Sequence, residues 1–461
     1  MRLNNRFQQM KKAYSLKPMP SYEERITHLK KLKSELKDNV EELSLALNLD
    51  FKGRSMQDTM LELLPSINNI DYTIAHLKEW MLPSPRHAGD LLPSSKVEVV
   101  YQPKGVVGII STWNAPIMVT INPLTTAIAS GNRVMIKLSE FTPNLNFCLK
   151  SILEKVFYED EVILIEGEVE IAQEFASLPF DHLLFTGSTA VGKLIMKSAA
   201  ENLTPVTLEL GGKSPVVIDK TLPITKVVER LMIGKNANNG QLCIAPDYVM
   251  IHEDRLNEFI REYQQQYQNY FPKGVFDGQL TSVANKRQFD RIQQLLEDAE
   301  DNNFQIIPVH EDSIDREVHR MVTHMVINPS PNSSVMTQEV FGPVLPIITY
   351  KKVEECITFI VDRPRPLACY LFSDNIDLQE IFKANIHSGG LCINDTIFHA
   401  SVDDAPFGGI GNSGMGAYHG KEGFLTFSHS KTVLQTGEES IVKYLFLPGE
   451  NEIKTQLLSQ L

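Results

Sequence analysis

Over about the first 80 positions, hydrophobic residues recur every three or four residues, which is the period of an α-helix. Ser21 and Glu24 fit a capping box, so a helix is predicted to begin just after Pro20. Residues 58–81 predict a second helical stretch, interrupted at Pro65. The first helical stripe consists of Ile26, Leu29, Leu32, Leu36, Val40 and Leu43. We interpret these stripes as packing faces, not as a cofactor-binding surface.

The pattern changes after residue 82. Residues 82–95 are rich in Pro, Ser, Gly and charge, which indicates a connector, and apolar positions 97, 99 and 101 predict a strand after it. Short apolar runs then alternate with helical stretches, which predicts an α/β fold with a doubly wound parallel sheet and ligands at the strand ends. The runs lie at 106–111, 134–138, 162–165, 182–186 and 206–210, and the helical stretches near 116–129, 143–157, 168–177 and 189–201. A second alternating region is expected from residue 214 to about 398.

Length and charge restrict the class of protein. A chain of 461 residues has room for roughly three domains. The formal net charge of −13 argues against DNA or RNA as the main partner, because phosphate binding requires a basic face. No apolar run approaches the ~20 residues of a membrane helix, and no apolar signal region follows the first residues. We therefore expect a cytoplasmic protein without nucleic-acid or membrane partners.

The five cysteines lie at positions 148, 243, 356, 369 and 392. Their odd number and the lack of CxxC spacing argue against a disulfide framework and against a metal site, and favour free thiols. Cys243 is the candidate for chemistry, because small and amide residues precede it and allow close backbone approach. A single cysteine between Leu242 and Ile244 also fits a buried core thiol.

Two polar residues stand at the ends of predicted strands. Glu209 lies between leucines and before two glycines, where partial desolvation would raise its pKa towards the range of a general base. The alternative is a strand-end glutamate that faces solvent. Asn114 follows the run at 106–111, where its amide could donate to a developing oxyanion or could cap a helix before Pro116.

Two glycine-containing segments could bind an anion. Residues 185–193 follow a strand and open a helix with Gly187 and Ser188, which fits a pyrophosphate site at a helix N-terminus or an ordinary turn. This segment lacks the GxGxxG pattern of the usual dinucleotide fold. Residues 406–416 are rich in glycine, and we favour a tight backbone crossing between domains over a phosphate cradle.

Together, these segments resemble the aldehyde dehydrogenase superfamily. The resemblance rests on six separated motifs in the family order and extends over nearly the whole chain. The motifs are Trp113-Asn114-Ala115-Pro116, Lys137-Leu138-Ser139-Glu140, Phe185-Thr186-Gly187-Ser188, Glu209-Leu210-Gly211-Gly212-Lys213-Ser214-Pro215, Gly240-Gln241-Leu242-Cys243 and Glu339-Val340-Phe341-Gly342-Pro343. Residues 245–248 and 412–424 resemble the class 3 branch, which takes aromatic and medium- to long-chain aldehydes, and within it the bacterial coniferyl aldehyde dehydrogenases.

The resemblance implies a Rossmann-type cofactor domain, an α/β catalytic domain and a small β oligomerisation element. It assigns residues 1–82 and 103–210 to the NAD(P)-binding domain and 211–418 to the catalytic domain. Residues 83–102 and 419–445 form the bridging element, and 446–461 a C-terminal tail. It also implies a homodimer that uses residues 82–102 and the C-terminal stretch.

The activity implied by the resemblance is oxidation of an aldehyde to the carboxylic acid with NAD or NADP. Cys243 would attack the aldehyde, the Asn114 amide and the backbone N–H of Cys243 would hold the oxyanion, and Glu209 would activate water to hydrolyse the thioester. The implied cofactor-binding residues are Trp113, Lys137, Glu140, Gly187, Ser188, Glu339 and Phe341. A carboxylate at Glu140 would repel a 2′-phosphate, which favours NAD, although class 3 members often accept both.

Substrate contacts are expected from Met118, Leu242, Asn394 and Phe398. Leu242 is bulkier than the residue often found there, and Thr112 replaces a proline, which changes the stiffness of that loop. Two alternatives remain: a CoA-acylating dehydrogenase, which Glu209 disfavours, and a non-catalytic NAD-binding protein on the same scaffold.

Overall fold

The computed structural model describes residues 3–90, 92, 94–437, 446, 448–449 and 451–459. Residues 438–445 of the predicted bridging element, and the remaining positions of the predicted tail, lie outside the described residues. Within the described ranges, no helix is long and apolar enough to cross a membrane.

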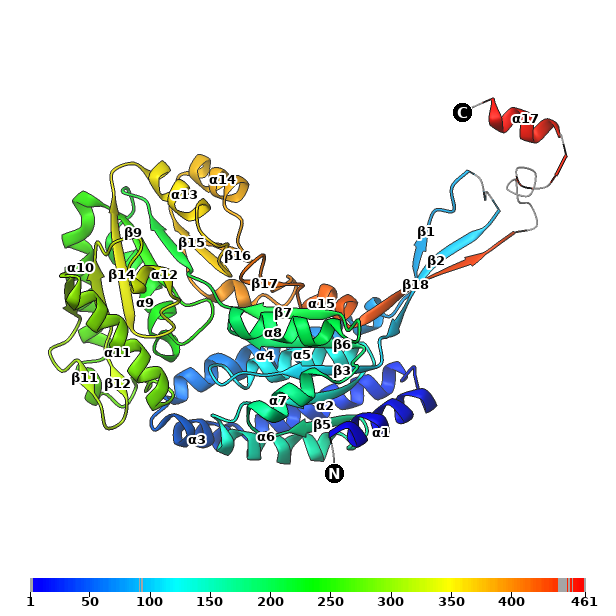
Figure 1. The fold of residues 1–461 in the computed structure, drawn as a ribbon, viewed down its shortest axis with the longest axis horizontal. Coiled ribbons are helices and arrows are strands. Elements are labelled where there is room, and N and C mark those ends of the chain that lie inside the picture. The colour runs from blue at the N-terminus through cyan, green and yellow to red at the C-terminus, as the bar shows by residue number, and fades with distance from the viewer. Residues whose placement is uncertain are drawn as a thin grey trace.

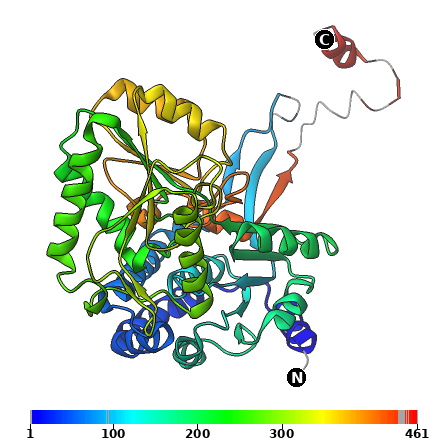
Figure 2. The ribbon, with the colours of Figure 1, turned by 60° about the vertical axis from the view of Figure 1, so that its left-hand side comes forward.

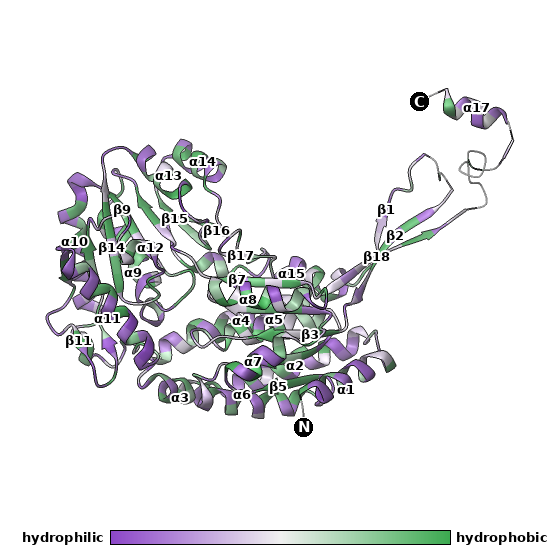
Figure 3. Cartoon of the chain, viewed as in Figure 1, coloured by the Kyte–Doolittle hydropathy of each residue, from purple (hydrophilic) through white to green (hydrophobic). Residues whose placement is uncertain are grey.

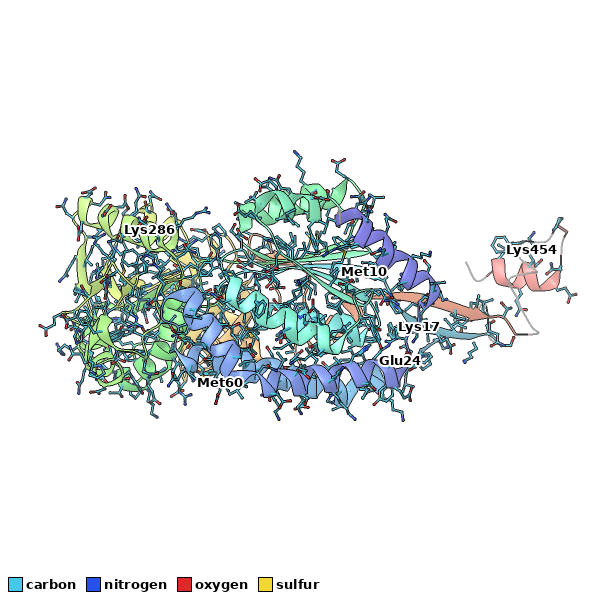
Figure 4. All side chains as sticks on the ribbon, turned by 90° about the horizontal axis from the view of Figure 1, so that it is seen from below. Met10, Lys17, Glu24, Met60, Lys286 and Lys454 are labelled. Atoms are coloured by element: carbon cyan, nitrogen blue, oxygen red, sulfur yellow. The ribbon has the colours of Figure 1, made fainter. Side chains whose placement is uncertain are left out.

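The chain begins with the helices α1 (Leu3–Leu16), α2 (Tyr22–Asp38), α3 (Val40–Phe51) and α4 (Met56–Trp80), as the early helical pattern predicts. The capping box is confirmed, because the Ser21 hydroxyl accepts from the Glu24 N–H at 3.2 Å while the Glu24 carboxylate accepts from the Ser21 N–H at 2.9 Å. Glu24 also pairs with Lys17 at the turn between α1 and α2 (Figure 4).

The predicted interruption at Pro65 is wrong. Helix α4 continues through this residue without a break. Proline removes only one backbone donor, to the carbonyl four residues earlier, and that carbonyl belongs to Leu61 on the exposed side of the helix. The buried side of α4 packs against α2 and against α5 (Met118–Ala129), which holds the helix together.

A six-stranded sheet forms the first lobe, in the order β17-β7-β6-β3-β4-β5 (Figure 1). Its strands are β3 (Val106–Ile110), β4 (Arg133–Lys137), β5 (Val162–Ile165), β6 (His182–Gly187), β7 (Val206–Leu210) and the short β17 (Gly414–Met415). All neighbours are parallel except β17, so the predicted parallel sheet is confirmed. The flanking helices are α5, α6 (Pro143–Val156), α7 (Val169–Ala176) and α8 (Thr189–Ala200).

Alternate side chains of these strands enter two cores. Leu184 packs into the core under α2 to α6, whereas its neighbours Leu183 and Phe185 pack into the core under α1, α7 and α8. Both faces of the sheet are therefore covered, which explains why the strands read as continuous apolar runs. In Figure 3 the strands inside the lobes are mainly green, whereas the helices around them carry both green and purple residues.

A seven-stranded sheet forms the second lobe, in the order β10-β13-β14-β9-β8-β15-β16. Its strands are β8 (Pro215–Ile218), β9 (Tyr248–His252), β10 (Gln305–Pro308), β13 (His324–Ile327), β14 (Val344–Tyr350), β15 (Ala368–Phe372) and β16 (Gly390–Ile393). Its helices are α9 (Ile224–Asn236), α10 (Leu256–Tyr270), α11 (Lys286–Asp301), α12 (Ser334–Thr337), α13 (Val353–Val361) and α14 (Ile376–Asn385). Only β10 runs antiparallel to its neighbour.

A third sheet projects away from both lobes as an arm (Figures 1 and 2). It consists of β1 (Ser84–Arg86), β2 (Lys96–Pro103) and β18 (Ser428–Gln435), all antiparallel. The segment predicted as a connector thus contains β1, and the predicted strand after it is confirmed as β2. The other described strands and α-helices are the hairpin β11 (Ile314–Asp315) with β12 (Arg320–Met321), and the helices α15 (Gly420–Thr426) and α17 (Glu452–Leu458).

The two lobes are joined directly where β7 ends and β8 begins. Only residues 211–214 separate Leu210 from Pro215. The carboxyl edge of the first sheet therefore faces the amino edge of the second. Residues 406–416 also cross here, because Gly414 pairs with Glu209 and a Cβ on Gly414 would lie 2.2 Å from the Leu208 carbonyl. This agrees with the backbone crossing favoured from the sequence.

Candidate functional site

The strand order brings the predicted polar residues to one edge. Neighbouring strands β7, β6, β3 and β4 end in that order, and Glu209, Ser188, Asn114 and Lys137 lie at or just beyond those ends. Ligands of parallel sheets bind at this edge. Across the gap, Cys243 precedes β9, while Glu339 and Phe341 precede the adjacent β14.

The loop before Cys243 has an unusual backbone. Asn238, Asn239 and Gly240 have φ values of 47°, 52° and 75°, a left-handed run that asparagine and glycine tolerate best. A Cβ on Gly240 would lie 2.6 Å from the Gly342 carbonyl, so no larger residue fits there.

Hydrogen bonds hold this loop in place. The Asn239 amide donates to the carbonyls of Thr281 and Met321 at 2.9 and 3.1 Å. The Gln241 side chain donates to the Ser282 carbonyl at 3.1 Å and accepts from the Ala284 N–H at 2.9 Å. These contacts explain why amides precede Cys243, because each amide can both donate and accept.

Cys243 lies in an environment that keeps its sulfur protonated at neutral pH. Burial, followed by the nearby carboxyl groups of Glu339 and Glu209, raises the pKa of the Cys243 thiol to about 12. The thiolate is the nucleophilic form, so the site needs added positive charge or a proton acceptor to generate it. Two carboxyl groups face the thiol, and either could accept its proton.

Glu209 does not face solvent, so the solvent-exposed alternative is excluded. The residue is only 3% exposed, and neither of its carboxyl oxygens has a hydrogen-bond partner among the described residues. Burial raises the pKa of Glu209 well above its ordinary value. A buried carboxyl without partners retains free lone pairs for a water molecule, and the raised pKa makes it a stronger base.

Asn114 is not a helix cap, because α5 begins at Met118. The side-chain amide of Asn114 donates to the Gln241 carbonyl at 3.0 Å, two residues before Cys243. Its backbone carbonyl accepts from Arg54 Nη1 at 3.1 Å and from the Asn238 amide at 2.8 Å. The structure therefore places an amide donor against the loop that carries the thiol.

Glu339 reaches across to the connection between the sheets. It accepts from the Gly212 N–H at 3.1 Å, and a Cβ on Gly211 would lie 2.3 Å from its carboxyl oxygen. Glycine at 211 is thus required for this approach. Burial and the neighbouring Asp247 raise the pKa of Glu339 to about 8. Lys213 anchors the same segment, pairing with Asp247 and donating to two main-chain carbonyls near Glu339.

Trp113 and Phe341, the two aromatic residues predicted for this site, contact each other. The rings of Trp113 and Phe341 pack edge to face with centroids 5.4 Å apart, and the Phe51 ring lies 6.4 Å from that of Trp113. Phe341 has a φ of 47°, which a bulky residue adopts only when its surroundings impose it.

The remaining predicted cofactor residues have geometry that fits a nucleotide. The Lys137 ammonium is buried, donates to the Leu138 carbonyl at 2.6 Å and lies 3.8 Å from the Glu140 carboxylate. An ammonium has three donors, so capacity remains for hydroxyl groups of a ribose. Ser188 caps the first turn of α8 by accepting from the Val191 N–H at 3.4 Å, and the preceding Gly187 ends β6. A helix N-terminus of this kind favours phosphate.

A cavity of about 490 Å³ lies beside Cys243, where its wall includes Asn238, Leu242 and Ile244 of the surrounding loop. Three of the residues expected to contact substrate, Met118, Leu242 and Phe398, line it. The structure does not bring Asn394 to this cavity, because its amide side chain bonds to the backbone of Ser373 and to Asp374. The walls also include Met60, Leu61, Leu64, Pro65, Ala115, Ile244, Ile397 and Ala400.

Sequence reasoning missed three charged residues of the cavity wall: Arg54, Asp58 and Glu62. Their spacing of four residues was visible, but on a helix such spacing is typical of a solvent-facing row of charges. The same helix also carries exposed leucines, so its buried face could not be identified from hydrophobicity alone.

The chemistry of Cys243 is testable by its reactivity. A pKa of about 12 predicts that the rate constant for iodoacetamide labelling rises about tenfold per pH unit from 7 to 10, because only the thiolate reacts. Peptide mass spectrometry separates this label from that on the other cysteines. A rate that levels off below pH 9 would contradict the described environment.

Comparison with known proteins agrees with this geometry. The aldehyde dehydrogenase family model matches residues 3–433. A protein of Pseudomonas aeruginosa named "Probable coniferyl aldehyde dehydrogenase" is 43% identical over 449 residues, covering 97% of this chain and 94% of the relative. The coniferyl aldehyde dehydrogenase of a Pseudomonas species (strain HR199) is 38% identical, covering 94% and 90% respectively.

Solved structures extend the match to three dimensions. Staphylococcus aureus AldH, solved in a substrate-bound state, superposes with a TM-score of 0.93 at 32% identity, covering 100% of this chain and 99% of that one. Members of aldehyde dehydrogenase family 3 are also among the relatives, in agreement with the predicted branch. The chain therefore belongs to the aldehyde dehydrogenase family and is an oxidoreductase that oxidises aldehydes with a nicotinamide cofactor.

Proposed function

We propose that Cys243 is the nucleophile of this reaction, with Asn114 as the oxyanion donor and Glu209 as the base that activates water. The observation that carries the proposal is the convergence of a thiol, an amide donor and a buried, unpartnered carboxyl at one meeting of sheet edges. The Cys243 thiol gives its proton to the carboxylate form of Glu209 or Glu339, its sulfur forms a bond to the aldehyde carbon, and the C=O π electrons move to the oxygen, which becomes an oxyanion. The Asn114 amide and the Cys243 N–H stabilise this charge.

Hydride removal and hydrolysis complete the reaction. A bound nicotinamide cofactor supplies the hydride acceptor, after which the acyl group remains on Cys243 as a thioester. Glu209 then takes a proton from water, the water oxygen adds to the acyl carbon, and the Cys243 sulfur leaves. The carboxylic acid is released. The free lone pairs of Glu209 support this role over transfer to CoA, because a CoA-acylating enzyme needs no water-activating base.

For the cofactor, we propose NAD over NADP. Lys137 and Glu140 would hold the adenosine ribose, Ser188 and Gly187 with Trp113 the pyrophosphate, Glu339 the nicotinamide ribose, and Phe341 would pack near the ring. The support for NAD is the Glu140 carboxylate, which would face a 2′-phosphate with a like charge.

Cofactor choice is testable at Glu140. Glu140→Gln removes the negative charge at constant size, so the ratio of kcat/KM for NADP to that for NAD should rise about tenfold or more. Glu154→Gln, which changes an exposed carboxylate elsewhere on the same lobe, serves as the control and should leave the ratio unchanged. An unaltered ratio in Glu140→Gln would argue against this carboxylate as the determinant.

For the substrate, we propose an aromatic aldehyde such as coniferyl aldehyde, or a medium- to long-chain aliphatic one. The largely apolar cavity and the names of the two Pseudomonas relatives support this choice. An apolar wall of this size favours ring or alkyl groups through removal of their surface from water.

The test is a panel of coniferyl, benzaldehyde-type and C6–C12 aldehydes, with cofactor reduction followed by absorbance and the product identified as acid or acyl-CoA. We expect turnover to the acid, highest kcat/KM for apolar aldehydes, and loss of more than about 10³-fold in Cys243→Ser. Cys392→Ser, a second partly buried thiol, is the matched control and should keep activity within about twofold. Acyl-CoA formation, or full activity in Cys243→Ser, would contradict the proposal.

We also propose a domain division and a homodimer. The six-stranded lobe serves as the cofactor domain, the seven-stranded lobe as the catalytic domain, and the arm of β1, β2 and β18 as the oligomerisation element. Each described sheet ends in two edge strands with one unpaired edge each; β16 and β18 are among them, and such an edge suits strand addition by a second copy. Sedimentation should give twice the 52.0 kDa chain mass, and a monomer at micromolar concentration would refute the dimer.

The five free cysteines support a reducing, cytoplasmic location.

A further inference from the structure

Three charged side chains at the start of α4 are buried between the two lobes. Arg54 lies just before the helix, and Asp58 and Glu62 lie one turn apart on the same face of its first turns. They are only 2%, 7% and 3% exposed. Figure 4 labels Met60, which marks this stretch of α4. Charged groups are rarely buried without partners, so their contacts need explanation.

Arg54 and Glu62 bracket the segment that carries Asn114. Arg54 pairs with Glu62 through Nη2 and donates through Nη1 to the Asn114 carbonyl at 3.1 Å. The other Glu62 oxygen accepts from the N–H groups of Ile117 and Met118 at 2.8 and 3.1 Å. One ion pair therefore fixes both ends of residues 114–118.

Asp58 holds the nucleophile loop from the same helix face. Its carboxylate accepts from the Asn238 N–H at 2.8 Å and from the Thr281 hydroxyl. The Asn238 amide in turn donates to the Asn114 carbonyl at 2.8 Å. That carbonyl thus receives two donors: Arg54 from the segment just before α4 and Asn238 from the loop before Cys243.

We propose that Arg54, Asp58 and Glu62 are positioning residues for aldehyde oxidation, which hold the Asn114 amide and the Cys243 loop in mutual register. This inference rests on the roles proposed above for Asn114 and Cys243. The three residues act through main-chain groups of the two loops and do not touch the reacting atoms.

The hydrogen bonds favour positioning over two simpler explanations. As a source of stability, a buried ion pair is generally no better than well-packed apolar side chains. As ligands for a polar substrate group, these side chains have little free capacity: both Glu62 oxygens and both terminal nitrogens of Arg54 have partners, while Arg54 Nε has none among the described residues. Their contacts are directional hydrogen bonds to the two loops. Such bonds matter for catalysis because a misplacement of catalytic groups by about 1 Å greatly lowers the reaction rate.

The test is a double-mutant cycle between Arg54 and Asn114. Arg54→Met should lower kcat/KM for the best aldehyde by about 10- to 100-fold, mainly through kcat, with the Kd for NAD unchanged within about twofold. Arg54→Lys should recover part of the rate, because an ammonium can still donate to the Asn114 carbonyl. In an Asn114→Ala background, Arg54→Met should cost less than about threefold, because the donor that it positions is already absent.

Arg25→Met is the matched control. Arg25 is also a buried arginine bound to a main-chain carbonyl, that of Ala129 at 2.8 Å, but it contacts neither loop. It should lower Tm comparably while reducing kcat/KM less than about threefold, and its effect should be the same with or without Asn114. Glu62→Gln, which keeps the side-chain volume, replaces Arg54→Met in the cycle if that variant fails to fold.

The outcomes separate the hypotheses. A loss in Arg54→Met that persists in full in the Asn114→Ala background, or an equal loss in Arg25→Met, would overturn the positioning role and leave the proposed mechanism intact. Full activity of Asn114→Ala alone would overturn both the oxyanion role of Asn114 and this inference. A rate loss that depends on Asn114, with NAD affinity retained, supports the inference.

Discussion

The structure depends on the direct passage of the chain from β7 into β8. Because residues 211–214 leave no room for an intervening helix, the carboxyl edge of one sheet must face the amino edge of the next. Glu209 lies at the first edge, and Cys243 and Glu339 precede strands at the second. Glycines in the connection let Glu339 approach within contact of the main chain. The position of the site is therefore determined first by the topology of the two sheets and only then by individual side chains.

Burial at this junction sets the chemistry. The thiol of Cys243 and the carboxyl groups of Glu209 and Glu339 all have raised pKa values, and burial is the largest cause in each case. Each group therefore favours its neutral form. The free-energy cost of its charged form falls when a positive charge or a polar substrate binds beside it. A carboxyl without partners is costly in a folded protein, which is why such a group marks a site of function more often than a site of packing.

Much of this could be predicted from the sequence. The strands of the first lobe, the capping box at Ser21 and the grouping of Asn114, Glu209 and Cys243 follow from local apolar patterns and from motifs whose order the fold preserves. The continuity of α4 through Pro65 could not be predicted, because it depends on which side of the helix faces solvent.

Side-chain contacts between residues far apart in the chain could not be predicted from the sequence either. In the sequence, the spacing of Arg54, Asp58 and Glu62 is typical of charges that face solvent. Their buried role depends on hydrogen bonds to residues more than fifty positions away, which only the structure shows. Asn394 was expected to contact the substrate, whereas its side chain hydrogen-bonds to the backbone of Ser373, just after β15.

The central claim is that Cys243 carries the acyl group and that Glu209 is needed to release it. The most direct measurement is the intact mass of Glu209→Gln mixed with NAD and an aromatic aldehyde, followed by peptide mapping. The account predicts that an acyl adduct accumulates on Cys243, because its formation does not need the carboxylate and its hydrolysis does. Impaired turnover without any adduct, or an adduct on a different residue, would contradict it.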